Sequence, residues 1–272
     1  MRKHIYVLTC VFLALPSFAA QKPELIPFWD RSNEQNNATI AHDAWQSVLD
    51  TYLKQHASGI NRFDYGSLKS TEVDISKLNS YLNKLQSIDP REYSRAEQKA
   101  YWINFYNSLT VKVVVDSYPV DSIKEIHESW IPRSGPWGDV HARVAGQELT
   151  LDNIEHGILR PIWNDDRIHY AVNCASIGCP NLATEAYTAQ NMELLLNSGA
   201  REYVNHPRGV DVVDEDFIVL SSIYDWWVFD FGNSEEGVIA HLLKYANPDL
   251  AEQLNNFDGA IDYEYDWDLN QP

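Results

Sequence analysis

The sequence predicts a helix-rich α+β fold, built as a single domain with a small, mainly antiparallel sheet. Long segments have the apolar spacing of amphipathic helices, whereas the strand-like segments are short and lie in pairs around turns. No internal repeat or low-complexity block divides the chain. Its 9 tryptophans and 15 tyrosines supply enough apolar surface for a sizeable core.

Residues 1–20 have the three-part pattern of a secretory signal peptide. Arg2 and Lys3 carry the positive charge, residues 5–15 form an apolar stretch too short to span a bilayer, and cleavage is expected near Ala19 or Ala20. We therefore expect a periplasmic or secreted protein without a membrane span. Residues 21–37 should be an extended lead-in, and residues 38–272 one domain whose N-terminal part is helical.

The first half of this domain should be mostly helical. The apolar spacing predicts helices over residues 38–56, 75–88 and 95–118, with a short extended piece at 63–65. Ser94 and Glu97 form a capping box at the start of the third helix, and Pro119 ends it. The middle of that helix is apolar nearly all round, so it should be buried.

Two asparagines interrupt this buried helix. Asn104 and Asn107 lie on one face, and buried amides need hydrogen-bond partners. We expect those partners to be the backbone around Cys174 and the short helix that carries Glu155.

The second half alternates short strands and helices. Residues 140–150 should form a hairpin that turns at Gly146, and Asp152 with Glu155 forms a capping box for a short helix that ends at Arg160. Further strands are expected at 168–173, 209–213, 217–220 and 261–265, and further helices at 188–204, 222–230 and 235–245.

The net charge of the mature chain indicates which classes of partner it can bind. Without the leader, 19 basic residues stand against 39 acidic ones, a net charge near −20. Nucleic-acid binding depends on neutralising phosphates with Lys and Arg, so this composition argues against it. A small molecule or a peptide remains the expected substrate. We expect no cofactor, because no phosphate-binding or dinucleotide-binding glycine motif occurs.

The candidate nucleophile lies in a loop rich in Ser, Gly and Pro. Cys174 and Cys179 are the only cysteines after the leader, and Cys174 directly follows the predicted strand. A thiol in such a place can act as a nucleophile when an imidazole is near. It can equally be one half of a Cys174–Cys179 disulfide, or an inert buried thiol.

Two histidines compete as the base that activates Cys174. In a regular strand, alternate side chains share a face, so His169 would point away from Cys174. We therefore prefer His156, on the preceding helix. Glu155 could orient an imidazole, although its place in the capping box offers a purely structural role. The other candidates for orienting the imidazole are amides: Asn104, Asn107 and Asn173.

Neighbouring residues suggest how a substrate could be held. Asn173, Ser176 or amides of the loop could stabilise an oxyanion. The loop at 130–137 contributes Trp130, Arg133 and Trp137 as candidate substrate contacts. A metal site is less well supported, because no H-E-x-x-H or paired C-x-x-C spacing appears.

Several long motifs resemble the domain of unknown function 547 family. They are DYGSL at 64–68, YWINFYNSLTVK at 101–112, LDNIEHGILR at 151–160 and HYAVNCASIGCP at 169–180, with a bacterial-type ending YDWDLN at 265–270. The resemblance implies roles for Glu155, His156 and Cys174, while the second cysteine is typical of bacterial-type members. Some multidomain relatives carry glutaredoxin-like modules, which implies thiol or glutathione chemistry.

These observations together lead to one expected function and two alternatives. We expect an exported cysteine-dependent hydrolase or acyl-transferase that acts on an amide, peptide or glutathione-like substrate. By analogy its fold would be papain-like or transglutaminase-like, and circularly permuted because His156 precedes Cys174. The alternatives are a non-catalytic envelope binding module stapled by a Cys174–Cys179 disulfide, and a metal-dependent hydrolase.

Overall fold

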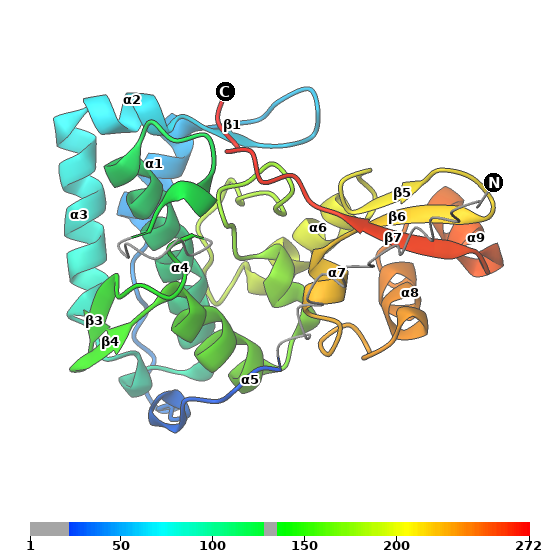
Figure 1. Cartoon of the computed structure of the whole chain (residues 1–272). Helices are drawn as coiled ribbons and strands as arrows, with labels where there is room; N and C mark the ends of the chain where they lie inside the picture. Colours follow the sequence, from blue (N-terminus) through cyan, green and yellow to red (C-terminus); the bar gives the residue numbers. More distant parts are fainter. Residues whose placement is uncertain (1–21, 128–134) are drawn as a thin grey trace, which may run out of the picture.

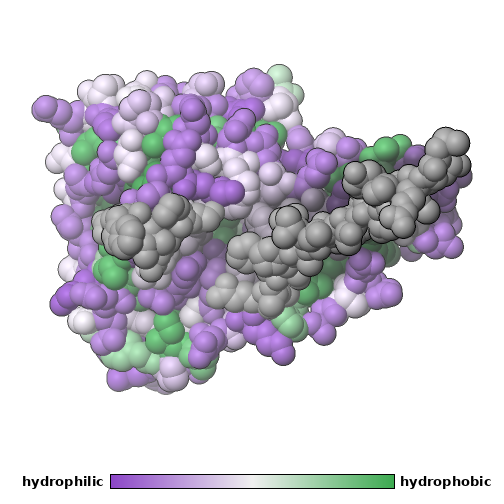
Figure 2. All heavy atoms as spheres, in the orientation of Figure 1, coloured by the Kyte–Doolittle hydropathy of each residue, from purple (hydrophilic) through white to green (hydrophobic). Residues whose placement is uncertain are grey.

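The structure, a computed structural model, describes residues 22–127 and 135–272. Helices and three small sheets make up this part, so the predicted helix-rich α+β class is confirmed (Figure 1). Much of the face drawn in Figure 2 is hydrophilic, with scattered apolar patches. In the described part of the chain, no helix has the length and apolar character needed to cross a bilayer.

The N-terminal half is a group of helices, as predicted. Four α-helices follow one another, with a two-stranded sheet between the first and the second: α1 (Asp43–Tyr52), β1 (Leu53–Lys54), β2 (Arg62–Phe63), α2 (Tyr65–Ser70), α3 (Glu72–Gln86) and α4 (Arg95–Ser117). The sequence did not indicate α2 as a helix. Asp64 caps it by accepting the Ser67 N–H.

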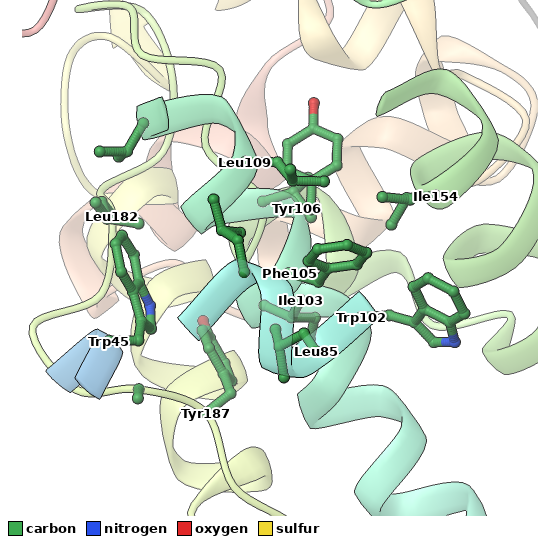
Figure 3. Packing of buried hydrophobic residues seen from close by; sticks show 14 of the residues in the cluster. Trp45, Leu85, Trp102, Ile103, Phe105, Tyr106, Leu109, Ile154, Leu182 and Tyr187 are labelled. Atoms are coloured by element: carbon green, nitrogen blue, oxygen red, sulfur yellow. The ribbon is translucent and has the colours of Figure 1, made fainter. Parts of the chain in front are cut away.

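Helix α4 is the central element of this half. Ser94 caps it as expected, but the Glu97 carboxylate accepts the N–H of Ile40 at 3.0 Å and does not complete the predicted capping box. Its apolar middle is buried, as predicted. The neighbouring helices and loops pack around this middle and form the larger of two hydrophobic clusters, part of which Figure 3 shows.

The C-terminal half contains a three-stranded sheet with helices packed on it. Its elements are α6 (Met192–Val204), β5 (Val210–Val212), β6 (Phe217–Ser221), α7 (Ile223–Trp226), α8 (Glu235–Leu243), α9 (Pro248–Asn256) and β7 (Ala260–Glu264). β5 pairs antiparallel and β7 parallel with the central β6. This half builds the second hydrophobic cluster. The sequence did not indicate α9.

The segment between the halves contains a confirmed hairpin. β3 (Ala142–Val144) pairs antiparallel with β4 (Gln147–Leu149). The turn between them has positive φ at Ala145 and at Gly146, as a two-residue hairpin turn requires.

The helix after this hairpin begins and ends differently from the prediction. Thr150 and Asn153 cap it reciprocally, and Asp152 makes no side-chain cap. The helix widens into a π-helical segment, η4 (Asn153–Leu159), and continues through Pro161 as α5 (Arg160–Trp163). Glu155 is therefore not a capping residue, which removes the structural role that the sequence offered for it.

The segment expected to be a strand at 168–173 is also different. It begins as a 3₁₀ helix, η5 (Asp166–Tyr170), capped by Asp165, which accepts the Arg167 N–H. Asp165 also forms ion pairs with Lys99 and Arg167, so local charge pairing fixes a turn where the apolar run suggested a strand. The strand prediction was wrong, and with it the alternation argument about His169.

The C-terminal segment connects the two halves. After β7, residues 265–270 run back across the molecule toward the N-terminal helices (Figure 1). Their backbone bonds to the loop that carries Cys174: Asp268 and Asp266 accept the N–H groups of Ile177 and Gly178, and Asn270 donates to Ala175. The candidate site therefore lies where the two halves meet.

Candidate active site

The Cys174 loop is held in place by a buried amide. Asn107 of α4 donates to the carbonyl of Ala171 at 2.9 Å and accepts the N–H of Asn173 at 2.8 Å. Asn104, one turn earlier, bonds instead to the backbone N–H and carbonyl of Tyr187. Asn107 thus has the expected partner near Cys174, whereas Asn104 serves a different loop.

Asn173 is a structural residue of the loop. Its side chain accepts the N–H of Ala175 and donates to the carbonyl of Pro180, so both ends of the amide are used. Ala175, directly after the candidate nucleophile, has φ of 63°. A non-glycine residue in the left-handed region carries strain that the surrounding structure must hold, and such strain gathers at functional sites.

Gly178 allows the C-terminal segment to approach the loop closely. A Cβ at this position would lie 2.8 Å from the backbone nitrogen of Asp266 and 3.1 Å from a ring carbon of Tyr265. Because glycine has no side chain, the two segments can bond through their backbones. This approach brings Tyr265 to the thiol.

Two hydroxyl groups surround the sulfur of Cys174. Its Sγ lies 3.1 Å from Ser176 Oγ and 3.0 Å from Tyr265 Oη, and these two oxygens are 2.9 Å apart. Cys174 as a residue is only partly buried, whereas Cys179 is buried. Sequence reasoning had named Ser176, but nothing in local spacing pointed to Tyr265.

Cys179 lies beneath Cys174 as a second thiol. Both cysteines are free, and the backbone N–H of Cys174 donates to Cys179 Sγ at 3.0 Å. The hydrogen bond from Cys179, with those from Ser176 and Tyr265, lowers the pKa of Cys174 in spite of its burial. Burial raises the pKa of Cys179 and of Tyr265 well above their usual values, so both keep their protons and act as donors.

The Glu155–His156 pair belongs to a neighbouring charged network. Both side chains are buried on the π-helical segment η4, a type of irregularity that is frequent at functional sites. His169 Nε2 donates to Asp230 Oδ2 at 2.7 Å, and its Nδ1 lies 3.7 Å from Glu155 Oε1. Arg160 bonds to the same Asp230 oxygen at 2.6 Å.

Arg160 also determines the state of His156. Its Nη1 lies 3.1 Å from His156 Nδ1, so this ring nitrogen accepts a hydrogen bond. Burial, together with the charges of Arg160 and His169, lowers the pKa of His156 to about 4, against the opposing effect of Glu155. His156 is therefore neutral at pH 7. Its ring lies over Trp227, with centroids 4.4 Å apart.

The pKa of His169 is shifted in the opposite direction to that of His156. Burial lowers its pKa, but the hydrogen bonds and charges of Asp230 and Glu155 outweigh burial and raise it. The pKa of Asp230 falls to about 2, because the bonds from His169 and Arg160 outweigh its burial. The structure thus favours an imidazolium at His169, held between two carboxylates.

Neither imidazole contacts the sulfur. In the described part of the chain, the side-chain atoms bonded to Cys174 Sγ come from Ser176 and Tyr265. Glu155 is the member of the network whose charge reaches the thiol, since it raises the pKa of Cys174. His169 is directed into the network because its segment is helical, not because of strand alternation.

An aromatic cluster extends from the thiol along the surface. The ring of Tyr265 packs against Trp226 and Trp267, and Trp267 meets Trp137, with centroids 4.6 to 5.6 Å apart. Trp137, predicted as a substrate contact, is therefore connected through the ring of Trp267 to Tyr265, whose hydroxyl contacts Cys174. Trp130 and Arg133, the other predicted contacts in that loop, lie outside the described residues.

The charged network is not arranged as a metal site. Among residues 22–127 and 135–272, no three side chains of His, Cys, Asp or Glu are grouped so that they could hold a metal ion. The described geometry thus gives no support to the metal-dependent alternative.

The site and the fold define a class: a helix-rich α+β protein with a hydrogen-bonded free thiol beside a buried carboxylate–imidazole network. Residues 90–204, less than half of the chain, match the family model described as "Protein of unknown function, DUF547", so this stretch of the chain is similar to that family. The matched stretch includes Glu155, His156 and Cys174, whereas Tyr265 and Asp230 lie beyond it. No curated protein and no solved structure matches the chain.

Proposed function

We propose that this protein is an exported cysteine-dependent hydrolase or acyl-transferase that acts on an amide, peptide or glutathione-like substrate. One observation carries the proposal: the sulfur of Cys174 lies within 3.1 Å of two hydroxyl groups, in a loop fixed by Asn107. These hydroxyls and the Cys179 thiol favour the thiolate, which is the reactive form of cysteine.

The proposed reaction begins with loss of the Cys174 proton. The sulfur then forms a bond to the substrate carbonyl carbon, and the carbonyl electrons move to its oxygen. When the carbonyl reforms, the C–N bond breaks, the amine leaves with a proton, and the acyl group stays on Cys174 as a thioester. Attack by water completes hydrolysis, and attack by another amine or thiol completes acyl transfer.

The hydroxyls of Ser176 and Tyr265 are the proposed donors to the oxyanion. Most backbone N–H groups of the loop already have acceptors inside the protein: those of Cys174, Ala175, Ile177, Gly178 and Cys179. Tyr265 keeps its proton because burial, with the nearby thiol charges, raises its pKa. A donor that is already oriented stabilises the developing charge without reorganisation.

His156 is the proposed proton acceptor. Its pKa of about 4 leaves it neutral at pH 7, as a base requires, but its ring does not contact the sulfur. In the proposal, one water passes the proton to His156 Nδ1, the ring nitrogen without a proton, after Arg160 gives up its hydrogen bond to that atom. His169, held by Glu155 and Asp230, keeps the network in place. His156→Ala should therefore slow turnover at pH 7 more than it slows alkylation of Cys174.

The two cysteines allow a direct test of the proposal. Purified protein is assayed against a panel of peptide anilides and thioesters, alongside Cys174→Ser and Cys179→Ser variants. Activity should vanish in Cys174→Ser and persist, at a lower rate, in Cys179→Ser, because Cys179 supports the thiolate without reacting. Equal activity of wild-type protein and Cys174→Ser would contradict the proposal.

The binding-module alternative differs from the proposed enzyme in the redox state of Cys174 and Cys179. A stapled module would hold Cys174 and Cys179 as a disulfide in the exported protein, and neither thiol would be alkylated without reductant. The contact between the Cys174 N–H and Cys179 Sγ places the two residues close enough for this to be a real alternative. Intact mass after alkylation under non-reducing conditions separates the two.

Export is part of the proposal and rests on residues 1–20, which lie outside the described residues. Their charged, apolar and small-residue regions match a cleavable leader. N-terminal sequencing of protein from the periplasm or medium should find a start near Ala20 or Gln21. Recovery of Met1 on that material would contradict it.

A further inference from the structure

A hollow of about 350 Å³ lies next to Tyr265, on the side of the three-stranded sheet. Its volume falls in the range of small-ligand sites. Residues of the Cys174 loop, of the segment before β5 and of all three strands form its walls: Gly178, Pro207, Arg208, Asp211, Val219, Leu220, Glu264, Tyr265 and Asp266. Cys174 does not line the hollow, but the hydroxyl of Tyr265, one of the wall residues, contacts Cys174 Sγ.

Arg208 supplies the positive charge in this hollow. Its guanidinium lies over the ring of Tyr203 and donates to the carbonyl of Ile177 at 3.1 Å and to the side-chain oxygen of Asn181 at 2.8 Å. Neither acceptor is a carboxylate. Arg208 Nε has no partner in the described part of the chain, but this atom is buried, so only the Nη groups can donate to a ligand. A guanidinium has five N–H donors, so this one retains donor capacity.

Three carboxylates share the hollow with Arg208. Asp211 on β5, Glu264 on β7 and Asp266 just after β7 are exposed at its walls. No ion pair joins any of them to Arg208 within the described residues, and one side-chain oxygen of Asp266 accepts the N–H of Asp268. The cation and the anions thus line one space without neutralising each other.

We infer that this hollow binds the zwitterionic head group of an α-amino acid, with its carboxylate on Arg208 and its ammonium group on the carboxylates of Asp211, Glu264 and Asp266. An anion alone would meet three negative charges, and a cation alone would meet the positive charge of Arg208. A zwitterion satisfies both, and guanidinium–carboxylate pairs give strong, directional bonds. The inference rests on the proposed function, since it assigns that substrate its head group.

Calorimetry tests the site without needing turnover. The full mature protein with Cys174→Ala is titrated with L-glutamine, which combines a zwitterionic head group with a distal amide. N-acetyl-L-glutamine lacks the ammonium group, and L-glutamine amide lacks the carboxylate. L-glutamine should bind, and each blocked compound should bind about ten-fold more weakly or worse, because each loses charge-assisted bonds. Binding of all three with equal affinity would overturn the inference, as would no binding of L-glutamine.

Substitutions assign the two halves of the site. Arg208→Gln should remove the preference for a free carboxylate, and Glu264→Gln should reduce the preference for a free ammonium group. Because Arg208 also ties down the loop, Glu264→Gln, on an exposed strand, keeps the test meaningful if Arg208→Gln does not fold. Unchanged preferences in folded variants would contradict the site. The titrated protein carries Cys174→Ala, so its binding of the head group is measured without catalysis. Failure of the proposed reaction and failure of head-group binding are therefore separate results.

Discussion

The hydroxyl of Tyr265 lies 3.0 Å from the sulfur of Cys174, although 91 residues separate them in the sequence. This contact joins the end of β7 to the loop that follows η5, and it places a protonated donor on the candidate nucleophile. Because Tyr265 also packs on Trp226 and Trp267, its ring has little freedom to turn away.

Tyr265→Phe should slow alkylation of Cys174 by iodoacetamide near pH 7. The variant keeps the ring and removes one hydrogen bond to the sulfur, so the pKa of Cys174 rises and less thiolate is present. A loss of about 1 kcal/mol corresponds to about five-fold in rate. Tyr263→Phe, two residues earlier on β7, is the matched control and should react at the wild-type rate. Equal rates in both variants would show that the hydroxyl does not act on the thiol.

Asn107→Leu and Asn104→Leu should separate the site from the core. Each removes a buried amide with two backbone partners, so each should lower the free energy of unfolding by about 1–3 kcal/mol. Only Asn107 bonds to the segment that leads to Cys174. Asn107→Leu should therefore change the alkylation rate of Cys174, and Asn104→Leu should leave it unchanged. A change in the second variant but not in the first would contradict this assignment.

Gly178→Ala should change the reactivity of the Cys174 thiol indirectly, through the C-terminal segment. The added Cβ would meet the backbone of Asp266 at 2.8 Å and the ring of Tyr265 at 3.1 Å, so the C-terminal segment must shift. We expect slower alkylation of Cys174 and a lower melting temperature. Gly66→Ala meets only the side chain of Tyr118, at 3.2 Å, and serves as the control. Wild-type reactivity in folded Gly178→Ala would show that the close approach is not needed.

Asp230 should contribute stability that is lost in acid. Its pKa of about 2 in the folded protein lies below its ordinary value, so its ionised form stabilises the folded state above about pH 4. This stabilisation, about 2 kcal/mol, should disappear as the pH falls from about 4 to 2. Asp230→Asn should be less stable at pH 7, and its free energy of unfolding should fall less across that window.

The control for this prediction is Glu193→Gln. Glu193 pairs with Arg167 but is largely exposed, so its removal should hardly change the pH dependence of unfolding. Denaturant unfolding of the three proteins between pH 7 and pH 2.5 makes the comparison. If the free energy of unfolding of Asp230→Asn fell in acid by as much as that of the wild-type protein, the ion pairs of Asp230 with His169 and Arg160 would not be the cause of the acid sensitivity.

Local pattern was enough to predict the elements whose stability is local. The hairpin at Ala142–Val144 and Gln147–Leu149, the long helix Arg95–Ser117 and the antiparallel pair β5–β6 all agree with their apolar spacing and turn residues. The Cys174 loop could likewise be located, because its cysteines are the only ones after the leader.

The local sequence pattern was not enough where tertiary contacts determine the secondary structure or the position of a side chain. The apolar run before Cys174 is buried, but the ion pairs of Asp165 turn its first part into a 3₁₀ helix, so strand alternation misplaced His169. The π-helical segment changes which side chains of Glu155, His156 and Arg160 face one another, and no periodicity argument foresees it. Tyr265 and Asp230 reach the site only through packing of distant segments.

The most direct measurement of the central claim is the detection of an acyl group on Cys174. Protein is mixed with an activated peptide thioester, quenched in acid within the first turnovers, and digested for mass spectrometry. We predict an acyl adduct on the peptide that carries Cys174, absent from Cys174→Ser and formed more slowly in His156→Ala, which lacks the proposed acceptor of the Cys174 proton. Turnover of the substrate with no adduct on Cys174, or an adduct on Cys179 alone, would contradict it.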